Sequence, residues 1–266
     1  MFLEDVTHMY RYYAKNAKKV NVRTTYPKIL SRPNPSAEFV KSSPNYDLYF
    51  DKSGLLIECT QLDKNQKIIF KYNEFSLLEK LEIFGIGSKY VTETTTFYYD
   101  DERRIIQELV SESGYGDDND DGDPPEIYYD YDGSKMTMTL PPDLNCKDLG
   151  TFTYIHNQLN QVIEEKGVRN ENELINWYRN EYNEKGQKIK EISLDENGNP
   201  EGFDEYSYNE KGLETGFKSM NKEGVYNGYY NDRLYQYNEK GDWINHVLTD
   251  EFGAPKIIYD REIEYF

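Results

Sequence analysis

The sequence predicts a mainly β protein, a long, twisted antiparallel β-meander of about nine repeats of ~27 residues, with an N-terminal helix. Two observations lead to this prediction. The segment Tyr-Asn-Glu-Lys-Gly occurs three times, at 182–186, 208–212 and 237–241. Around it, apolar and polar residues alternate with period two and run into a turn signal, as strands do when they enter a tight reversal.

The N-terminal residues 1–22 have the spacing of a helix. Phe2, Val6, Met9 and Tyr13 recur at helical intervals and make one apolar stripe. We expect this helix to cap an open edge of the sheet. Residues 24–45 contain four prolines and little periodicity, which predicts a surface arm. The predicted domains are therefore 1–45, helix and arm, and 46–266, the repeats.

The repeats are aligned by the aromatic residue that comes before each main turn. The nine aligned positions are Phe50, Tyr72, Tyr99, Tyr131, Tyr154, Tyr182, Tyr208, Tyr237 and Tyr265. A second turn lies inside each unit, clearest at 195–200, so one repeat is strand, turn, strand, turn. This arrangement predicts about 16–18 strands in a sheet that curls as its twist accumulates. We expect the rings to be buried on one face and the acidic groups to stay wet on the other.

The tyrosine pair, the Asp or Asn and the following Gly resemble the tyrosine–aspartate (YD) repeat of Rhs-type proteins. The resemblance covers residues 46–266. A weaker similarity to MORN-type hairpins is seen at 226–231, Tyr-Asn-Gly-Tyr-Tyr-Asn. Both resemblances imply a β-meander, and the first links the chain to polymorphic toxins.

Charge limits the choice of partners. The 266 residues carry 49 Asp and Glu against 31 Lys and Arg, a formal net charge of −18. Such a surface repels nucleic acid and anionic lipid, so we expect neither as a partner, and it attracts a basic protein. The N-terminus lacks a secretory signal and no apolar run is long enough to span a bilayer, which predicts a cytoplasmic location.

The acidic loop 117–123 is a candidate for a bound ion or a partner. Asp117, Asn119 and Asp121 match the start of a calcium loop, with Gly122 at the sharp turn. Position twelve of that pattern is Tyr128 instead of Glu. Three interpretations stay open: calcium as the single candidate cofactor, a solvated acidic tip, or a docking loop for a basic partner. The docking residues would be Asp117, Asp118, Asp120, Asp121 and Asp123, with Trp243 as a further candidate anchor.

No catalytic motif is present. The histidines, His8, His156 and His246, are far apart in sequence, and the cysteines, Cys59 and Cys146, form no CxxC pair. Carboxylates are so abundant that chance assembles many pairs, so a buried pair in the structure would be the sign of an enzyme. We therefore predict no enzymatic activity.

The leading hypothesis is an acidic immunity protein that neutralises a toxin domain by covering its basic active-site cleft. The alternative is a surface or exported YD-repeat module that binds carbohydrate or a cell surface.

Overall fold

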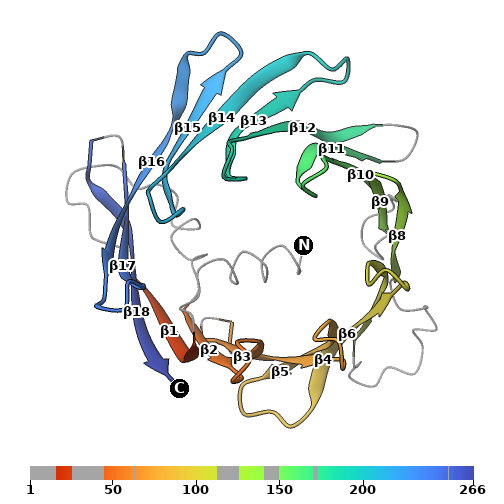
Figure 1. The fold of residues 1–266 in the computed structure, drawn as a ribbon, viewed down its shortest axis with the longest axis vertical. Helices are drawn as coiled ribbons and strands as arrows, with labels where there is room; N and C mark the ends of the chain where they lie inside the picture. Colours follow the sequence, from red (N-terminus) through yellow and green to blue (C-terminus); the bar gives the residue numbers. More distant parts are fainter. Residues whose placement is uncertain are drawn as a thin grey trace. The chain divides into compact units, whose positions relative to one another are not determined.

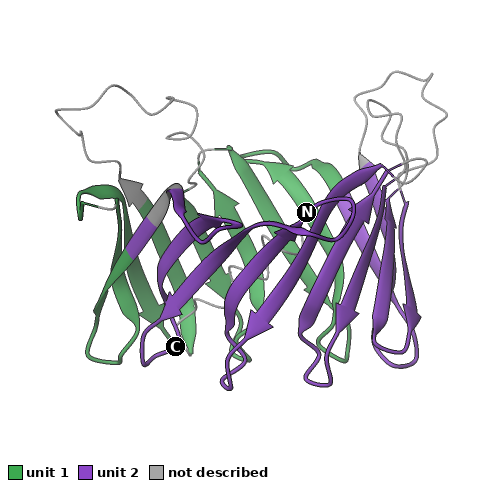
Figure 2. Ribbon diagram, turned by 90° about the horizontal axis from the view of Figure 1, so that it is seen from above, with its two compact units in different colours: residues 1–93, 233–266 green, residues 94–232 purple. Residues whose placement is uncertain are grey.

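The structure is a computed structural model that describes residues 16–25, 45–62, 64–112, 126–140, 150–169, 173–250 and 252–266. These residues form eighteen strands and no helix (Figure 1). Hydrogen bonds place all the strands in one sheet, and every pair with a determined register is antiparallel. The chain divides into two compact units, residues 1–93 with 233–266 and residues 94–232 (Figure 2).

The strands of the first unit are β1 (Ala17–Thr25), β2 (Tyr46–Phe50), β3 (Leu56–Gln61), β4 (Gln66–Tyr72), β5 (Leu78–Gly85), β17 (Trp243–Thr249) and β18 (Pro255–Tyr265). Those of the second unit are β7 (Ile105–Glu112), β8 (Glu126–Asp132), β9 (Lys135–Leu140), β10 (Gly150–His156), β11 (Val162–Val168), β12 (Leu174–Tyr182), β13 (Lys188–Leu194), β14 (Pro200–Tyr208) and β15 (Glu214–Asn221). The unit boundary falls within β6 (Val91–Tyr99) and β16 (Tyr226–Tyr237).

The turns explain why Asp or Asn follows the repeated aromatic residue. In the turn after β14, the Asn209 side-chain oxygen accepts hydrogen bonds from the backbone N–H groups of Lys211 and Leu213, both at 3.0 Å. The fourth turn residue, Gly212, has a φ of 81°, which glycine adopts without steric cost. Ser76 occupies the same place in the turn after β4 with a φ of 62°. The Asp or Asn side chain thus accepts hydrogen bonds from backbone N–H groups of the turn and stabilises the chain reversal.

In four of the repeats, the repeated tyrosine joins a hairpin to the one before it. Its hydroxyl donates to the carbonyl of the first residue after the preceding turn. Tyr208 donates to Lys188 at 2.6 Å and Tyr182 to Val162 at 2.7 Å. Tyr72 donates to Leu56 at 2.8 Å and Tyr131 to Ile105 at 2.9 Å. We call this contact the tyrosine latch. Phenylalanine, which stands at the first aligned position as Phe50, fills the same space but cannot donate this hydrogen bond.

The first unit carries its apolar core on one face of the sheet. Every second residue of neighbouring strands points to this face, including Leu48, Cys59, Ile68 and Leu81, each at most 1% exposed. The period-two alternation read from the sequence is the cause, because strand side chains alternate between faces.

The predicted N-terminal helix is wrong over residues 17–22, which belong to strand β1. The segment Lys-Val-Asn-Val-Arg alternates with period two, and Val20 is fully buried opposite Leu48. The β-branched valines suit a strand better than a helix. Residues 1–15 and the arm residues 26–44 lie outside the described residues. Where the chain is described, no helix is long and apolar enough to cross a membrane.

The strand order is closed, so the prediction of a meander with an open, helix-capped edge is also wrong. Strand β1 pairs with β18 through eight residues and with β2 through four, and so links the last strand of the chain to the second. An unpaired edge exposes backbone N–H and C=O groups that attract other chains. Pairing β1 on both sides satisfies these groups within the sheet.

Candidate functional site

The acidic loop predicted to dock a partner or hold calcium, with Asp117, Asp118, Asn119, Asp120, Asp121 and Asp123, lies outside the described residues. Elsewhere, the described part of the chain contains no group of three or more His, Cys, Asp or Glu residues arranged to hold a metal.

Trp243 lies in β17 of the first unit, within an aromatic cluster. Its ring makes edge contacts with Tyr235 and His246, and the Arg261 guanidinium lies 4.0 Å above it. The imidazole of His246 stacks between Tyr235 and Tyr259, with ring centroids 4.6 and 5.1 Å away. Burial, and then the charge of Arg233, lowers the pKa of His246 to about 3. His246 is therefore neutral at physiological pH and packs as an aromatic ring.

The other candidate residues are dispersed. His156 Nδ1 lies 3.2 Å from the carbonyl of Ser134. Cys59 is buried in the core, and burial raises the pKa of its thiol to about 12, so it is not a nucleophile. His8 and Cys146 lie outside the described residues.

The second unit contains a hollow of about 320 Å³ that sequence reasoning missed. We call it the acidic hollow. The residues that define it come from strands β12 to β15 and are Tyr178, Glu191, Ser193, Gly202, Asp204 and Ser219. They form two rows of directly opposed residues, one containing Tyr178, Ser193 and Gly202 and the other Glu191, Asp204 and Ser219. Ser193 and Gly202 of the first row form the floor of the hollow, and Glu191 and Asp204 of the second row provide its negative charge.

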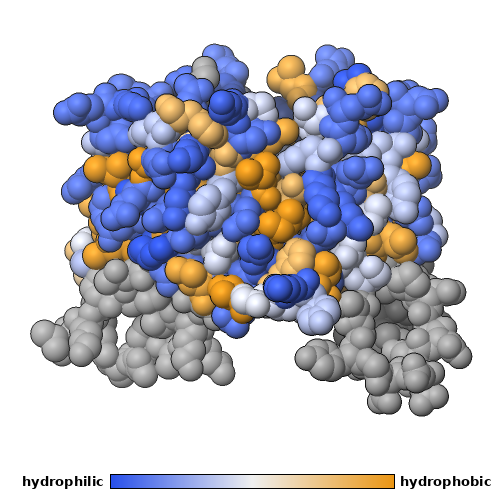
Figure 3. Space-filling model, turned by 90° about the horizontal axis from the view of Figure 1, so that it is seen from below, coloured by the Kyte–Doolittle hydropathy of each residue, from blue (hydrophilic) through white to orange (hydrophobic). Residues whose placement is uncertain are grey.

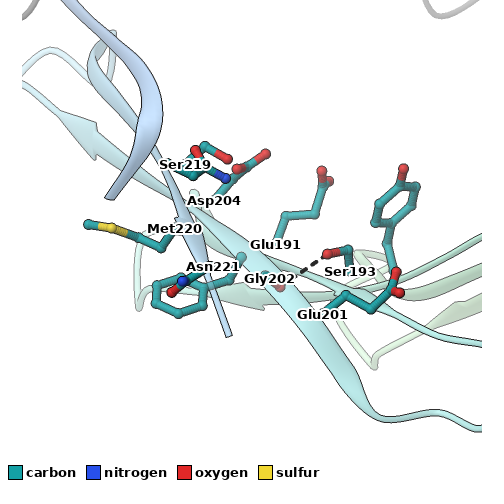
Figure 4. Close-up of a pocket in the computed structure, with 11 residues that line it drawn as sticks. Glu191, Ser193, Glu201, Gly202, Asp204, Ser219, Met220 and Asn221 are labelled. Atoms are coloured by element: carbon teal, nitrogen blue, oxygen red, sulfur yellow. Dashed lines mark hydrogen bonds between the residues drawn. The ribbon is translucent and has the colours of Figure 1, made fainter. Parts of the chain in front are cut away.

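Small residues create the floor of the hollow. The Ser193 hydroxyl donates to the carbonyl of Gly202 at 3.2 Å (Figure 4). A Cβ atom at position 202 would lie 2.8 Å from the carbonyl oxygen of Met220 on the neighbouring strand, closer than real Cβ contacts come. Glycine is therefore required at 202, and its missing side chain leaves the floor of the hollow open.

An irregularity in β16 borders the hollow. Lys218 and Met220 of β15, two residues apart, pair with Tyr230 and Tyr226, which are four residues apart. The β16 strand therefore bulges at this point, and Asn227 from the bulge also lines the hollow. The bulge coincides with the segment 226–231 that resembles a MORN hairpin. Bulges are enriched beside functional sites because they redirect side chains.

Two carboxylates lie side by side in the second row of the hollow. Glu191 and Asp204 are directly opposed on neighbouring strands, and Figure 4 shows both side chains on the same side of the ribbon. Burial raises the pKa of Asp204; a hydrogen bond from Ser219 lowers it in part, and the charge of Glu191 raises it further. Lys188 forms an ion pair with Glu191 at 2.5 Å. One cation therefore serves a pair of acids that repel each other.

These acids also correct the expected separation of rings and charges. Asp204 and Tyr206 are two residues apart in β14, so they point to the same face. Burial, together with Glu191 and Asp204, raises the pKa of Tyr206 well above its ordinary value. Tyrosines and carboxylates thus share one face here. The sequence signal that was available is the loss of apolar residues at 191, 193, 202 and 204, where the alternation calls for them.

Comparisons with known proteins show no family. No family model matches the sequence, and no curated protein matches it. A porin-like protein from Bacteroides uniformis has 7% identity over 95% of this chain and 100% of its own, with a TM-score of 0.35. A porin-like protein from Bacteroides vulgatus has 13% identity over 94% and 98%, with a TM-score of 0.33. A TcdB2-TccC3 structure has 11% identity and a TM-score of 0.40; the match covers 92% of this chain and 16% of that one. No family membership follows from these low scores, and the resemblance to YD repeats stays a prediction.

Proposed function

We propose that this chain is a non-enzymatic binding protein that receives basic side chains of a protein partner in the acidic hollow. The observation that supports this proposal most directly is the opposed pair of Glu191 and Asp204 on one face of the sheet. The toxin domain as partner and the cytoplasmic location stay predictions from the sequence.

The physical argument starts from the cost of the pair. Like charges directly opposite each other on neighbouring strands destabilise a sheet. Burial adds to this cost at Asp204, whose raised pKa shows that the ionised form is disfavoured. A lysine or arginine side chain of a partner would bring positive charge between the two carboxylates and remove both penalties. The hollow thus turns a local instability of the free protein into binding free energy.

The lining of the hollow fits the rest of such a side chain. Tyr178 supplies aromatic surface on the same face as the carboxylates, and the aliphatic part of a basic side chain packs well on an aromatic ring. The net charge of −18 would steer a basic partner toward the protein before contact. On the face shown in Figure 3, hydrophilic residues surround separate apolar patches.

A peptide titration tests the proposal. Fluorescent octa-arginine is titrated into the full chain and into Glu191→Gln/Asp204→Asn, and binding is followed by anisotropy at several salt concentrations. The matched control, Glu210→Gln/Glu239→Gln, removes the same charge from exposed turn positions. We expect the hollow variant to bind at least about tenfold more weakly, and the control to bind within about twofold of wild type. Equal losses in both variants would mean that only net charge attracts the peptide, and the proposal would fail.

A second candidate function is carbohydrate binding. It is favoured by the same lining, because carboxylates accept hydrogen bonds from sugar hydroxyls and Tyr178 offers a ring for stacking. A glycan array with the wild type and the Asp204→Asn variant distinguishes the two, since neutral glycans bind with little dependence on salt. The opposed carboxylates are also the groups that glycosidases use. Hydrolysis of chromogenic glycosides that Asp204→Asn abolishes would replace binding with catalysis as the function.

A further inference from the structure

Strand β1 occupies a slot between β18 and β2 in the first unit, and its charges complement those of the slot. On one face of β1, Lys19, Asn21 and Arg23 alternate. Opposite them on β18 lie Glu264, Glu262 and Asp260. A basic strand therefore sits in an acidic slot.

Direct contacts confirm this complementarity. Arg23 Nη2 lies 2.6 Å from Asp47 Oδ1, and Arg23 Nη1 donates to the carbonyl of Tyr46 at 2.9 Å. Toward β18, the neighbour on the other edge of β1, Lys18 Nζ lies 2.6 Å from Glu264 Oε1. On the opposite face, Val20 is fully buried between its partners Leu48 and Ile263. The slot thus selects a strand with basic residues on one face and β-branched residues on the other.

The covalent attachment of β1 is looser than that of its neighbours. No turn joins β1 to β18, because they lie at opposite ends of the sequence. On its other side, the twenty residues 26–45 separate β1 from β2, whereas five residues, 51–55, separate β2 from β3. Closing a fourfold longer loop lowers the effective concentration of its ends about eightfold. The connection to β2 therefore contributes less to holding β1 in its slot than the short connection contributes to the pairing of β2 with β3.

We propose that the slot between β18 and β2 is a strand-binding site for a second copy of this chain, whose β1 replaces the resident strand by exchange. The reciprocal exchange of β1 between two copies forms a dimer in which every pairing seen in the monomer is kept. Backbone hydrogen bonds provide affinity, and the alternating basic and β-branched residues provide register. This inference does not depend on the acidic hollow or on its proposed function.

The test uses two full-length variants with complementary charge reversals and different affinity tags. In the Arg23→Glu variant, the new carboxylate of β1 is repelled by Asp47 of the same chain. In the Asp47→Arg variant, the new positive charge of the slot repels Arg23 of the same chain. When the two chains are mixed and warmed below their unfolding temperature, exchange restores an Arg–acid pair at both slots. We expect a mixed-tag dimer that exceeds either homodimer by about tenfold, measured by tandem affinity capture and light scattering.

The double variant Arg23→Glu/Asp47→Arg is the control, because its pair is restored within one chain and it should dimerise no more than the wild type. Circular dichroism establishes that each single variant is folded before mixing. If either is unfolded, exchange between two differently tagged wild-type chains provides the same readout, with a mixed-tag dimer expected to increase with concentration. Folded chains that stay monomeric in the mixture, or in the wild-type exchange, would overturn the proposal.

Discussion

The tyrosine latch makes a quantitative prediction about stability. Tyr208→Phe removes one hydroxyl and leaves the ring in place, so the half-buried Lys188 carbonyl loses a donor at 2.6 Å. A hydrogen bond between neutral groups contributes about 1 kcal/mol net to folding. We therefore expect the free energy of unfolding to fall by about 1 kcal/mol. For a chain of this length that corresponds to a decrease in melting temperature of about 2–4 °C.

Urea unfolding followed by fluorescence and circular dichroism measures this change. Tyr90→Phe is the matched control, because Tyr90 is 83% exposed and its loss of a hydroxyl should change stability by less than about 0.5 kcal/mol. Combining Tyr182→Phe with Tyr208→Phe tests additivity and should cost about 2 kcal/mol. The latch would be refuted as a stabilising contact if Tyr208→Phe and Tyr90→Phe shifted the urea midpoint equally.

Three further predictions concern other positions. Gly167→Ala places a Cβ 2.4 Å from Asn176 Oδ1 and 2.5 Å from the Phe152 ring, so thermal unfolding should show a loss of about 1–3 kcal/mol; Gly85→Ala, with its nearest contact at 3.8 Å, should lose about 1 kcal/mol or less. Ser76→Gly relieves a φ of 62° and should raise stability by up to about 1 kcal/mol in urea titrations, and a loss would show that the side chain outweighs the strain. Burial raises the pKa of Asp204 in the folded state, so the folded protein binds this proton more tightly and ionisation destabilises it above that pKa. Asp204→Asn should therefore unfold at higher urea than wild type at pH 7, with the gain disappearing below the unfolded pKa of about 4; the same gain at all pH values would contradict the assignment.

Local patterns predicted much of the local structure. The Asx residue and the positive-φ fourth residue of these turns were readable from turns such as Asn209 to Gly212, because such turns depend on residues within five positions. The period-two alternation of apolar and polar residues predicted the strands for the same reason, because it is also a local property. The helix at residues 17–22 was predicted wrongly because the helical spacing of Phe2 to Tyr13 was extended into a stretch where Val20 and Val22 alternate with period two. Pairing with β2 and β18 decides between them, and those partners are distant in sequence.

The candidate site was less predictable. Glu191 and Asp204 are ordinary acids in an acidic chain, and only the register of β13 against β14 makes them direct neighbours. Gly202 was equally uninformative until the Met220 carbonyl was seen to approach it. Register depends on the whole set of cross-strand contacts and not on any one strand.

The sequence alone determined that this protein is a series of short antiparallel hairpins with Asx turns, because turn chemistry and strand alternation are local properties of the chain. The tertiary structure alone decided that β1 closes the strand order beside β18 and that two carboxylates meet over a glycine. Both depend on pairings between residues that are remote in sequence or set by register, and such pairings follow from the summed energy of the sheet.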